Sequence, residues 1–254
     1  MLIKTRLILD GSRDPYTNMA LDESILLNAA KNNIPTLRIY RWTPSSVSIG
    51  YFQKIKDTVN LDYCKINHIP VVRRITGGGA VYHDSMGEIT YSIVINEKQL
   101  ESKTIQDSME KICLGIVIAL KKVGINAEFQ PVNDIIASGK KISGSAQTKR
   151  GEWILQHGTL LVSSRIEKMA KALRISKEKL SDKAAKSILD RVTTVNTELN
   201  KEVNIETMAK HLCRGFSKAL NLKLRKSSYT DEELRLAARL RNEKYLNPKW
   251  TYKR

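Results

Sequence analysis

The sequence predicts an α+β fold in which helices flank a largely antiparallel or mixed sheet. Strand-like runs fill the first two-thirds of the chain, long helical patterns interrupt them at uneven intervals, and lysine-rich helical patterns follow. Uneven spacing disfavours a doubly wound parallel sheet, in which a helix would follow nearly every strand. A chain of 254 residues can bury one sizeable core. We therefore expect a single domain over residues 1–254, with a helical C-terminal third over about 165–254.

Short runs with alternating or continuous apolar character define the strands. We expect them at Leu2–Leu9, Thr36–Trp42, Ser46–Tyr51, Pro70–Ile75, Ile89–Ile95, Asn126–Phe129, Asp134–Ala137, Lys141–Gln147 and Trp153–Val162. Gly124 is expected to end an amphipathic helix that begins near Ile105. Further helices are expected at Ile166–Leu173, Ile205–Leu220 and Asp231–Tyr245.

The first helix is expected after the first strand. Apolar residues between Leu21 and Ala29 recur at helical spacing, and Asn18 is the expected N-cap. That start places Asp22 and Glu23 in the first turns, where the helix dipole favours negative charge.

Charge and hydropathy exclude some classes of protein. The longest apolar stretch, Cys113–Leu120, is too short to cross a membrane, and the N-terminus has no signal-peptide core, so we expect a cytoplasmic protein. The net charge of +17 is compatible with nucleic-acid binding. However, the basic residues are spread along the chain without an aromatic-interleaved motif. Solubility and attraction of anionic partners explain this charge equally well.

Three cysteines, Cys64, Cys113 and Cys213, stand far apart. They form no CxxC pair, so the sequence predicts neither a disulfide framework nor a zinc knuckle. Cys64 and His68 are four residues apart and could share a helix face, but two ligands do not complete a zinc site. Cys113 lies in an apolar helical pattern and is expected in the core.

The first motif with chemical content is RRITGGGAVYHD at residues 73–84. Three consecutive glycines between two strand-like runs allow the backbone to approach a ligand closely. Their N–H groups can cradle a phosphate or carboxylate, and an adjacent guanidinium can bind the same anion. The alternative is a flexible hairpin turn with solvated arginines. The spacing matches neither the Walker motif nor the dinucleotide-binding GxGxxG motif.

The second motif is Asn133-Asp134 followed by GKKISGSAQ at residues 139–147. A lysine at the start of a strand can neutralise the charge that builds on phosphorus during adenylate formation. Asn133 and Asp134 could contact adenine or ribose, or the carboxylate could hold magnesium. The alternative is a β-turn at Ser138-Gly139 with two exposed lysines.

The third motif is QHGTLL at residues 156–161. His157, followed by Gly158, could line a pocket where a carboxylate meets the α-phosphate. The alternative is a histidine in the core or at its rim, because histidine has many structural uses.

In this order the three motifs resemble the biotin/lipoate protein ligase family, and most closely the lipoate–protein ligases. The resemblance runs from about Leu7 to Tyr245, with weaker echoes at residues 19–23, 48–53 and 191–193. It implies a mixed-sheet catalytic domain similar to those of class II aminoacyl-tRNA synthetases and biotin ligases. The implied reaction is the ATP-dependent activation of lipoate as lipoyl-AMP, followed by transfer to a lysine of an acceptor protein.

The resemblance also implies roles for individual residues. Lys141 is the implied catalytic residue, which touches both nucleotide and acyl carboxylate and stabilises the anionic transition state. His157 and Gly158 would flank the lipoyl group, and Asp134 is a candidate magnesium ligand. The implied ATP-binding residues are Arg74, Gly77, Gly78, Gly79, Ala80, Val81, Tyr82, Asn133, Asp134 and Lys141.

The implied partners are ATP with Mg2+, lipoate, and apo lipoyl-domain acceptors. Such acceptors are the E2 acyltransferase subunits of 2-oxoacid dehydrogenases and the glycine cleavage H protein. The chain ends at Arg254, where the catalytic domain should close, without the accessory domain of larger lipoate ligases. We therefore expect a separate accessory polypeptide. Interaction with a membrane or nucleic acid is not expected.

The main rival is an octanoyl or lipoyl transferase of the same fold, which acts without ATP through a cysteine thioester. Related transferases carry that cysteine shortly before the second motif. Residues 127–138 contain none, and Asn133-Asp134 stands there instead, which favours a ligase. A biotin ligase resembles the sequence less at the glycine run, and a nucleic-acid-binding module would leave the three motifs unexplained.

Overall fold

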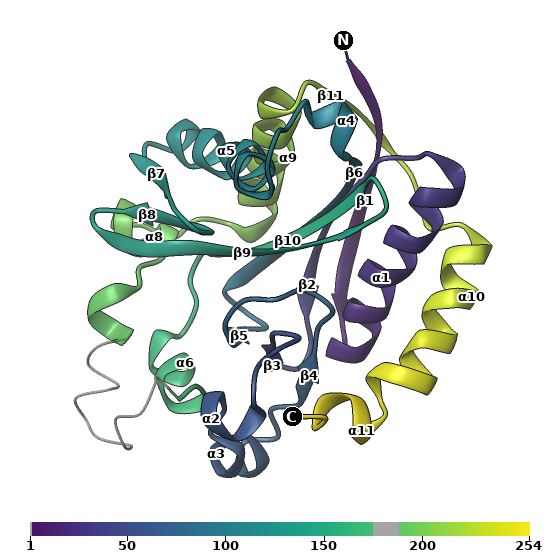
Figure 1. Cartoon of the computed structure of the whole chain (residues 1–254). Helices are drawn as coiled ribbons and strands as arrows, with labels where there is room; N and C mark the ends of the chain where they lie inside the picture. Colours follow the sequence, from purple (N-terminus) through teal and green to yellow (C-terminus); the bar gives the residue numbers. More distant parts are fainter. Residues whose placement is uncertain (1, 175–187) are drawn as a thin grey trace.

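The computed structural model describes residues 2–174 and 188–254, and two sheets organise them (Figure 1). The large sheet contains β1 (Ile3–Arg13), β2 (Thr36–Trp42), β6 (Glu88–Asn96), β7 (Ala127–Gln130), β8 (Asp134–Ala137), β9 (Lys140–Arg150), β10 (Trp153–Leu161) and β11 (Leu222–Lys226). The small sheet contains β3 (Ser46–Ile49), β4 (Val71–Arg73) and β5 (Val81–His83). The helical segments are α1 (Pro15–Asn32), α2 (Ile55–Thr58), α3 (Leu61–Ile66), α4 (Glu97–Leu100), α5 (Ile105–Lys122), α6 (Ile166–Ala172), α8 (Val195–Leu199), α9 (Ile205–Ala219), α10 (Asp231–Leu240), a π-helical turn (Arg241–Tyr245) and α11 (Pro248–Thr251).

The large sheet is mixed, with strand order β11-β1-β2-β6-β10-β9-β8-β7. β1 pairs in parallel with both β11 and β2, whereas all other neighbours in this sheet pair antiparallel. The predicted α+β class with a largely antiparallel or mixed sheet is therefore confirmed.

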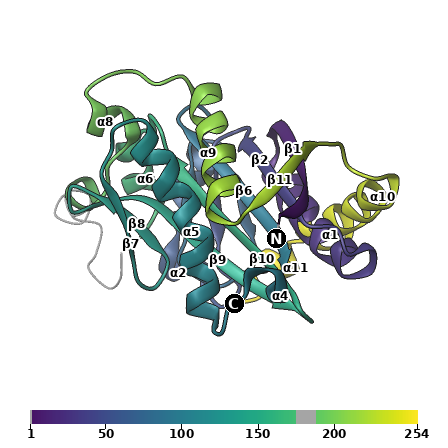
Figure 2. The same cartoon turned by 90° about the horizontal axis from the view of Figure 1, so that it is seen from above.

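One face of the sheet is covered by α5 and α9, which lie side by side (Figure 2). They approach closely at two glycines, since a Cβ on Gly215 would lie 2.1 Å from the carbonyl oxygen of Gly115. Ile93 and Ile95 of β6 point into this core, and Cys113 is fully buried there, as predicted. Gly124 follows α5 with a φ of +94°, which confirms the predicted helix stop.

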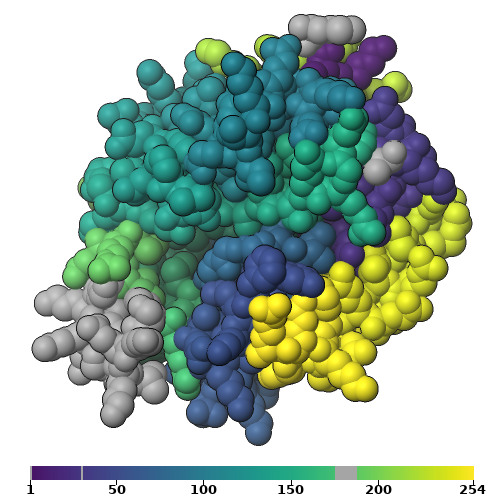
Figure 3. Space-filling view, in the orientation of Figure 1, coloured from purple at the N-terminus to yellow at the C-terminus, as the bar shows by residue number. Residues whose placement is uncertain are grey.

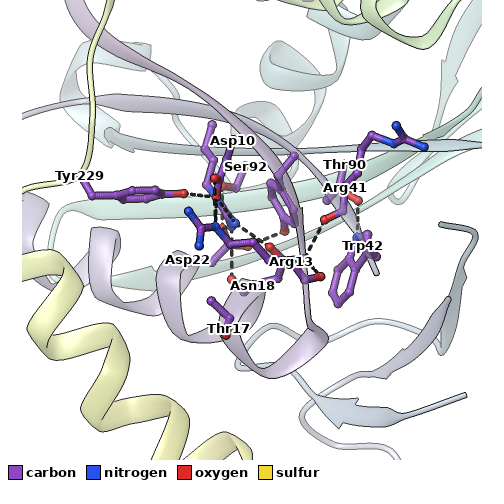
Figure 4. A network of polar contacts seen from close by, with 12 residues as sticks. Asp10, Arg13, Thr17, Asn18, Asp22, Arg41, Trp42, Thr90, Ser92 and Tyr229 are labelled. Atoms are coloured by element: carbon purple, nitrogen blue, oxygen red, sulfur yellow. Dashed lines mark hydrogen bonds and ion pairs between the residues drawn. The ribbon is translucent and has the colours of Figure 1, made fainter. Parts of the chain in front are cut away.

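The opposite face is covered by α1, and α10 packs against the outer side of α1 (Figure 1). The contact of α1 with the sheet contains a buried polar network. Arg38 of β2 is fully buried there and donates to Asp10, Asn18 and Asp22, the three acceptors labelled in Figure 4. Tyr229 also donates to Asp10. Because a buried cation is costly unless it is paired and hydrogen-bonded, this network specifies how α1 sits on the sheet.

The small sheet lies below the large one in Figure 1, against the C-terminal residues. In Figure 3 the C-terminal segment (yellow) lies against the blue segment that follows β3. Arg73 joins the two by donating to the backbone carbonyls of Trp250 and Thr251 and to three carbonyls among residues 50–53.

Two predictions about local structure were wrong. Asp14, not Asn18, caps α1, because its carboxylate accepts from the N–H groups of Tyr16 and Thr17 while Pro15 opens the helix. Asp22 and Glu23 therefore lie beyond the first turn and are buried. The described part of the C-terminal third is mostly helical, as predicted, but it also contains β11, which pairs with β1 and was not predicted. Residues 175–187 of that third lie outside the described part.

Candidate active site

A cavity that opens to solvent lies where the small sheet meets β9 and β10 of the large sheet, and its empty space, solvent-filled part included, is about 510 Å³. The predicted site residues that line it are Arg74, Gly79, Ala80, Val81, Asn133, Lys141, His157 and Gly158. The glycine run and Lys141 therefore border one space, although they are separated by more than 60 residues in sequence.

Four predicted residues lie outside this lining. Gly77 and Gly78 belong to the glycine loop, and Asp134 pairs with Lys141. Tyr82 is 1% exposed and packs into an apolar cluster around the small sheet. The position of the Tyr82 side chain therefore does not support a contact with a ligand in this cavity.

The glycine loop is packed tightly against the end of β3. A Cβ on Gly50 would lie 2.1 Å from the Gly78 carbonyl oxygen, so this contact requires glycine. Gly78 itself has a φ of +86°, a conformation that other residues adopt at a cost. Thr76 accepts the N–H of Tyr51 through its carbonyl, which ties the loop to the same segment.

Arg74 holds the loop from within. Its Nη2 donates to the carbonyls of Gly77 and Gly79, both at 2.7 Å. Its Nε donates to the Thr76 hydroxyl at 3.0 Å, and its Nη1 donates to the Ser48 carbonyl and hydroxyl, both at 3.2 Å. All five N–H donors of the guanidinium are thereby used inside the protein. In this arrangement Arg74 contributes its charge to the cavity without a free N–H for a ligand.

The charge of Arg74 has no direct counter-ion. Its side chain is 4% exposed, and its hydrogen-bond acceptors among the described residues are carbonyl and hydroxyl oxygens. Burial lowers its pKa to about 10, so it remains protonated at neutral pH. A buried cation that no carboxylate contacts creates a positive potential, which an anion in the cavity would offset.

The carbonyls that Arg74 holds also set the direction of two N–H groups. In a trans peptide the N–H of the next residue points opposite to the carbonyl. The N–H groups of Gly78 and Ala80 therefore point away from the guanidinium, and neither donates to another group in the described part of the chain. They are available to an anionic ligand, as the glycine run predicts.

His157 connects this loop to α1. Its Nε2 lies 2.7 Å from the Thr76 hydroxyl, and its Nδ1 lies 2.9 Å from a carboxylate oxygen of Asp22. Burial lowers the pKa of His157, and this effect outweighs the hydrogen bond to Asp22, which raises it. For Asp22, burial raises the pKa, but the hydrogen bond from His157 and the charge of Arg38 together lower it below 3.8. The pair is thus a neutral imidazole on an ionised carboxylate.

Lys141 reaches the cavity because of a β-bulge. Ile135 pairs with Ser143 but Ile136 pairs with Lys141, so Ile142 is an extra residue in β9. A bulge changes which face the following side chains occupy, and bulges are frequent beside active sites. The Lys141 ammonium lies 2.6 Å from a carboxylate oxygen of Asp134, and the Lys141 side chain remains 42% exposed. The turn at Ser138-Gly139, which the alternative interpretation of this motif required, is present with both residues at positive φ, but Lys141 nevertheless lines the cavity.

Gly144 makes room for the lysine, since a Cβ there would lie 2.7 Å from the Lys141 Cε. The Thr193 N–H donates to the Lys141 carbonyl at 2.9 Å, which supports the strand from behind. Asn133 is directed toward β9, where its amide nitrogen donates to the Ser145 carbonyl at 2.6 Å.

Asp134 is the predicted magnesium ligand. The described residues contain no group of three metal-binding side chains. Magnesium, however, is commonly held by one or two carboxylates together with substrate phosphates. Asp134 offers one such carboxylate beside Lys141, so the residues fit a metal bound mainly through a nucleotide.

The far end of the cavity was not predicted. It is lined by Met19, Tyr40, Trp42, His83 and Thr90, from α1 and the two sheets. Gly158 lies at the cavity on β10, where the strand is closely packed, because a Cβ there would lie 2.7 Å from the Tyr91 ring. Largely apolar walls with few polar groups suit an aliphatic chain. His83 belongs to the first motif, and Met19 belongs to the weaker echo at residues 19–23. Tyr40 carries no sequence signal beyond its place in a predicted strand.

All three cysteines lie in the described part of the chain, and none lines the cavity. Cys64 packs near the small sheet, and Cys113 is a residue of α5 that is buried in the core. Burial raises the pKa of both thiols to about 11, so neither is a ready thiolate.

The described residues contain no helix that is long and apolar enough to cross a membrane.

Several known proteins are similar to this chain in sequence and in fold. An octanoyltransferase LipM from Clostridioides difficile is 33% identical over 98% of both chains. A bi-partite lipoate protein ligase from Thermoplasma acidophilum, studied with its lipoyl domain, is 33% identical, has a TM-score of 0.90 and is matched over 97% of its length by 99% of this chain. A lipoate-protein ligase A bound with ATP is 31% identical, with a TM-score of 0.86 and 99% of each chain covered. The profile of the lipoyl protein ligase A/B catalytic domain matches residues 14–217. The chain therefore belongs to the lipoyl protein ligase A/B catalytic domain family.

Proposed function

We propose that this enzyme is an ATP-dependent lipoate–protein ligase. One observation carries the proposal: Lys141 and the glycine loop held by Arg74 border a single cavity that no cysteine lines. Two cationic groups on a thiol-free cavity suit the joining of two anions, a carboxylate and a triphosphate.

The proposed reaction has two steps. The carboxylate of the acid attacks the α-phosphorus of ATP, which gives acyl-AMP and releases pyrophosphate. The amine of an acceptor lysine then attacks the acyl carbon, which gives an amide, AMP and a proton. Activation is required because a carboxylate does not react with an amine at neutral pH, whereas AMP is a good leaving group.

Each side of the cavity has a role in this scheme. The free N–H groups of Gly78 and Ala80 and the charge of Arg74 bind phosphate oxygens. Lys141 leaves its ion pair with Asp134 and binds the two reactants instead. It holds the carboxylate of the acid near the α-phosphorus and stabilises the charge that develops there. Asp134 is the carboxylate that would hold magnesium, which would neutralise part of the phosphate charge. The apolar end between Tyr40 and Trp42 takes the aliphatic chain.

The proposed partners are lipoate, lipoyl-domain acceptors and a separate accessory polypeptide. The Thermoplasma acidophilum relative is described as bi-partite, which supports the last of these. Three free cysteines suit a reducing compartment, so a cytoplasmic location is part of the proposal.

The test is lipoate-dependent exchange of labelled pyrophosphate into ATP by the purified chain. We expect exchange, because adenylate formation is reversible and needs no acceptor. Absence of exchange with lipoate and with octanoate, alone and with an accessory chain, would overturn the ligase reaction. Complete ligation of an apo lipoyl domain by this chain alone would overturn only the proposal that a separate accessory polypeptide is needed.

A second candidate is octanoyl transfer without ATP, and the names of the curated relatives favour it over the ligase. This reaction needs a thiol that reaches the acyl carbon, forms a thioester and releases it to the acceptor. Incubation with an octanoylated donor protein, followed by intact mass measurement, would detect such a thioester. We expect no mass increase. If octanoyl transfer does occur, single changes of Cys64, Cys113 and Cys213 to serine test the intermediate. Transfer that survives each change would exclude a cysteine intermediate.

A further inference from the structure

Two chains of hydrogen bonds with the same chemical composition meet at Arg74. In the first, Arg74 donates to the Thr76 hydroxyl, which lies 2.7 Å from Nε2 of His157, whose Nδ1 faces Asp22 at 2.9 Å. In the second, Arg74 donates to the Ser48 hydroxyl, which lies 2.8 Å from Nε2 of His83. The Nδ1 of His83 faces Glu88 at 2.7 Å. We call these the Asp22 relay and the Glu88 relay.

Proton counting fixes the direction of each relay. The ionised carboxylate of Asp22 only accepts, so the Nδ1 of His157 carries a proton and donates to it. In the neutral imidazole the Nε2 is then unprotonated and accepts from the Thr76 hydroxyl, whose oxygen accepts from Arg74. The same reasoning gives His83 an Nδ1–H that donates to Glu88 and an Nε2 that accepts from Ser48.

The relays are buried along their whole length and come from elements far apart in sequence. Their hydroxyls, imidazoles and carboxylates are each between 0% and 6% exposed, so water does not compete for these bonds. Asp22 lies on α1 and His157 on β10, whereas Glu88 and His83 lie on β6 and β5. Other donors also reach the carboxylates: Tyr40 and Ser92 donate to Asp22, and Thr90 donates to the Glu88 oxygen that faces His83. The other oxygen of Glu88 is buried without a hydrogen-bond partner among the described residues. The negative charge that balances Arg74 is thus held two groups away from it.

We propose that Thr76, His157, Ser48 and His83 are positioning residues that keep Arg74 turned onto the carbonyls of the glycine loop. With the guanidinium held there, Gly77 and Gly79 cannot rotate, and the N–H groups of Gly78 and Ala80 stay directed toward the ligand. Because a hydroxyl and an imidazole separate each carboxylate from Arg74, no carboxylate contacts its guanidinium, and its charge acts on the ligand in the cavity. The functional part of this inference rests on the proposed function, in which the loop binds the phosphates of ATP.

The first arm of the test does not depend on any activity. Side-chain nitrogen NMR on the folded protein near pH 7.5 reports which nitrogen of each histidine carries the proton. We expect Nδ1–H and unprotonated Nε2 for His83 and His157, and the Arg74 Nε–H should exchange slowly with water. His68 and His211, which lie outside the relays, serve as internal references for histidines whose ring protons exchange with water. Protonation of Nε2 in either buried histidine at this pH would overturn its relay.

The second arm uses a matched pair of substitutions. Thr76→Val keeps the shape of the side chain but removes the hydroxyl, and Thr76→Ser keeps the hydroxyl. We expect Thr76→Val to raise the KM for ATP in pyrophosphate exchange by about 10-fold or more, the scale of one hydrogen bond to a charged group, with a smaller change in kcat. It should also speed exchange of the Arg74 Nε–H, and Thr76→Ser should restore both.

The outcomes separate the two proposals. Equal behaviour of Thr76→Val and Thr76→Ser would overturn the positioning role, even if the wild type is an active ligase. If Thr76→Val does not fold, Ser48→Ala tests the other relay by the same two measurements. If the wild type shows no exchange of pyrophosphate, the ligase proposal fails, whereas the histidine protonation and the Arg74 exchange rate still decide whether the relays exist.

Discussion

The two sides of the cavity carry the same charge in opposite settings. Arg74 is 4% exposed and donates all five of its N–H groups to the protein, whereas the Lys141 side chain is 42% exposed and pairs with one carboxylate. A fully bonded buried group is preorganised and costly to disturb, while a half-exposed ion pair rearranges at little cost. We infer that the Arg74 side fixes the shape of the site and that the Lys141 side moves during the reaction.

The largest expected effect is on stability, from breaking the buried side. Asp22→Asn removes a charge that pairs with Arg38 and accepts from Tyr40, Ser92 and His157. We expect a loss of about 3–5 kcal/mol in the free energy of unfolding, since Arg38 is left partly unpaired in the interior. Urea unfolding would measure it. The control is Asp134→Asn on the exposed side, where we expect a loss of less than about 1 kcal/mol in the free energy of unfolding. Equal losses in the two variants would contradict the contrast between a rigid buried side and a mobile exposed side.

The next effect is on activity, from the exposed side. Lys141→Ala should lower adenylate formation by about 10²-fold or more, because it removes the charge partner of the transition state. Unfolding should change little, since the side chain is half-exposed. Pyrophosphate exchange and a thermal melt would measure the two effects. Lys140→Ala, at the exposed neighbour, should keep normal exchange. Normal turnover of Lys141→Ala would remove this residue from the mechanism.

The contact between the glycine loop and β3 should be intolerant of a single methyl group. In Gly50→Ala the new Cβ would meet the Gly78 carbonyl at 2.1 Å, so the loop must shift. We expect a cost of about 1–3 kcal/mol, as in other overpacked sites, together with weaker binding of ATP. Isothermal titration and urea unfolding would test both. Gly11→Ala is the control, since nothing lies within 4 Å of its Cβ. A stable Gly50→Ala variant with normal affinity would show that the loop is not preorganised.

The smallest effect is the pH dependence of stability that His157 contributes. Burial lowers its pKa below the ordinary 6.5, so the unfolded chain binds this proton more readily than the folded one. Its contribution is therefore fully present above pH 6.5 and is lost as the pH falls below that value, by at most about 1.4 kcal/mol per pH unit. Asp22 contributes separately, because its pKa lies below 3.8 and its stabilisation is lost only under stronger acid.

Unfolding measured between pH 5.5 and 7.5 should show this slope in the wild type and a smaller one in His157→Gln. An identical slope in both proteins would mean that His157 is already solvated in the folded state, contrary to its burial.

The sequence by itself determined most of the local structure and the chemistry of the site. Periodicity located β2 and β8 at their observed bounds and α5 and α9 to within a few residues, because hydrophobic pattern and caps act over short distances. The glycine run and Lys141 carried a motif-level signal, and both border the predicted cavity. The roles of these residues remain predictions.

Only the tertiary structure decided what Asp22 and Arg74 do. The expected N-cap at Asn18 placed Asp22 in the first turns of the helix. It is buried instead, because Arg38 and Tyr40 of β2 and His157 of β10 converge on it. The five donors of Arg74 find acceptors on β3 and in the glycine loop, so its guanidinium faces inward. Hydrogen bonds between side chains far apart in sequence leave no local periodicity, and so no pattern along the chain reveals them.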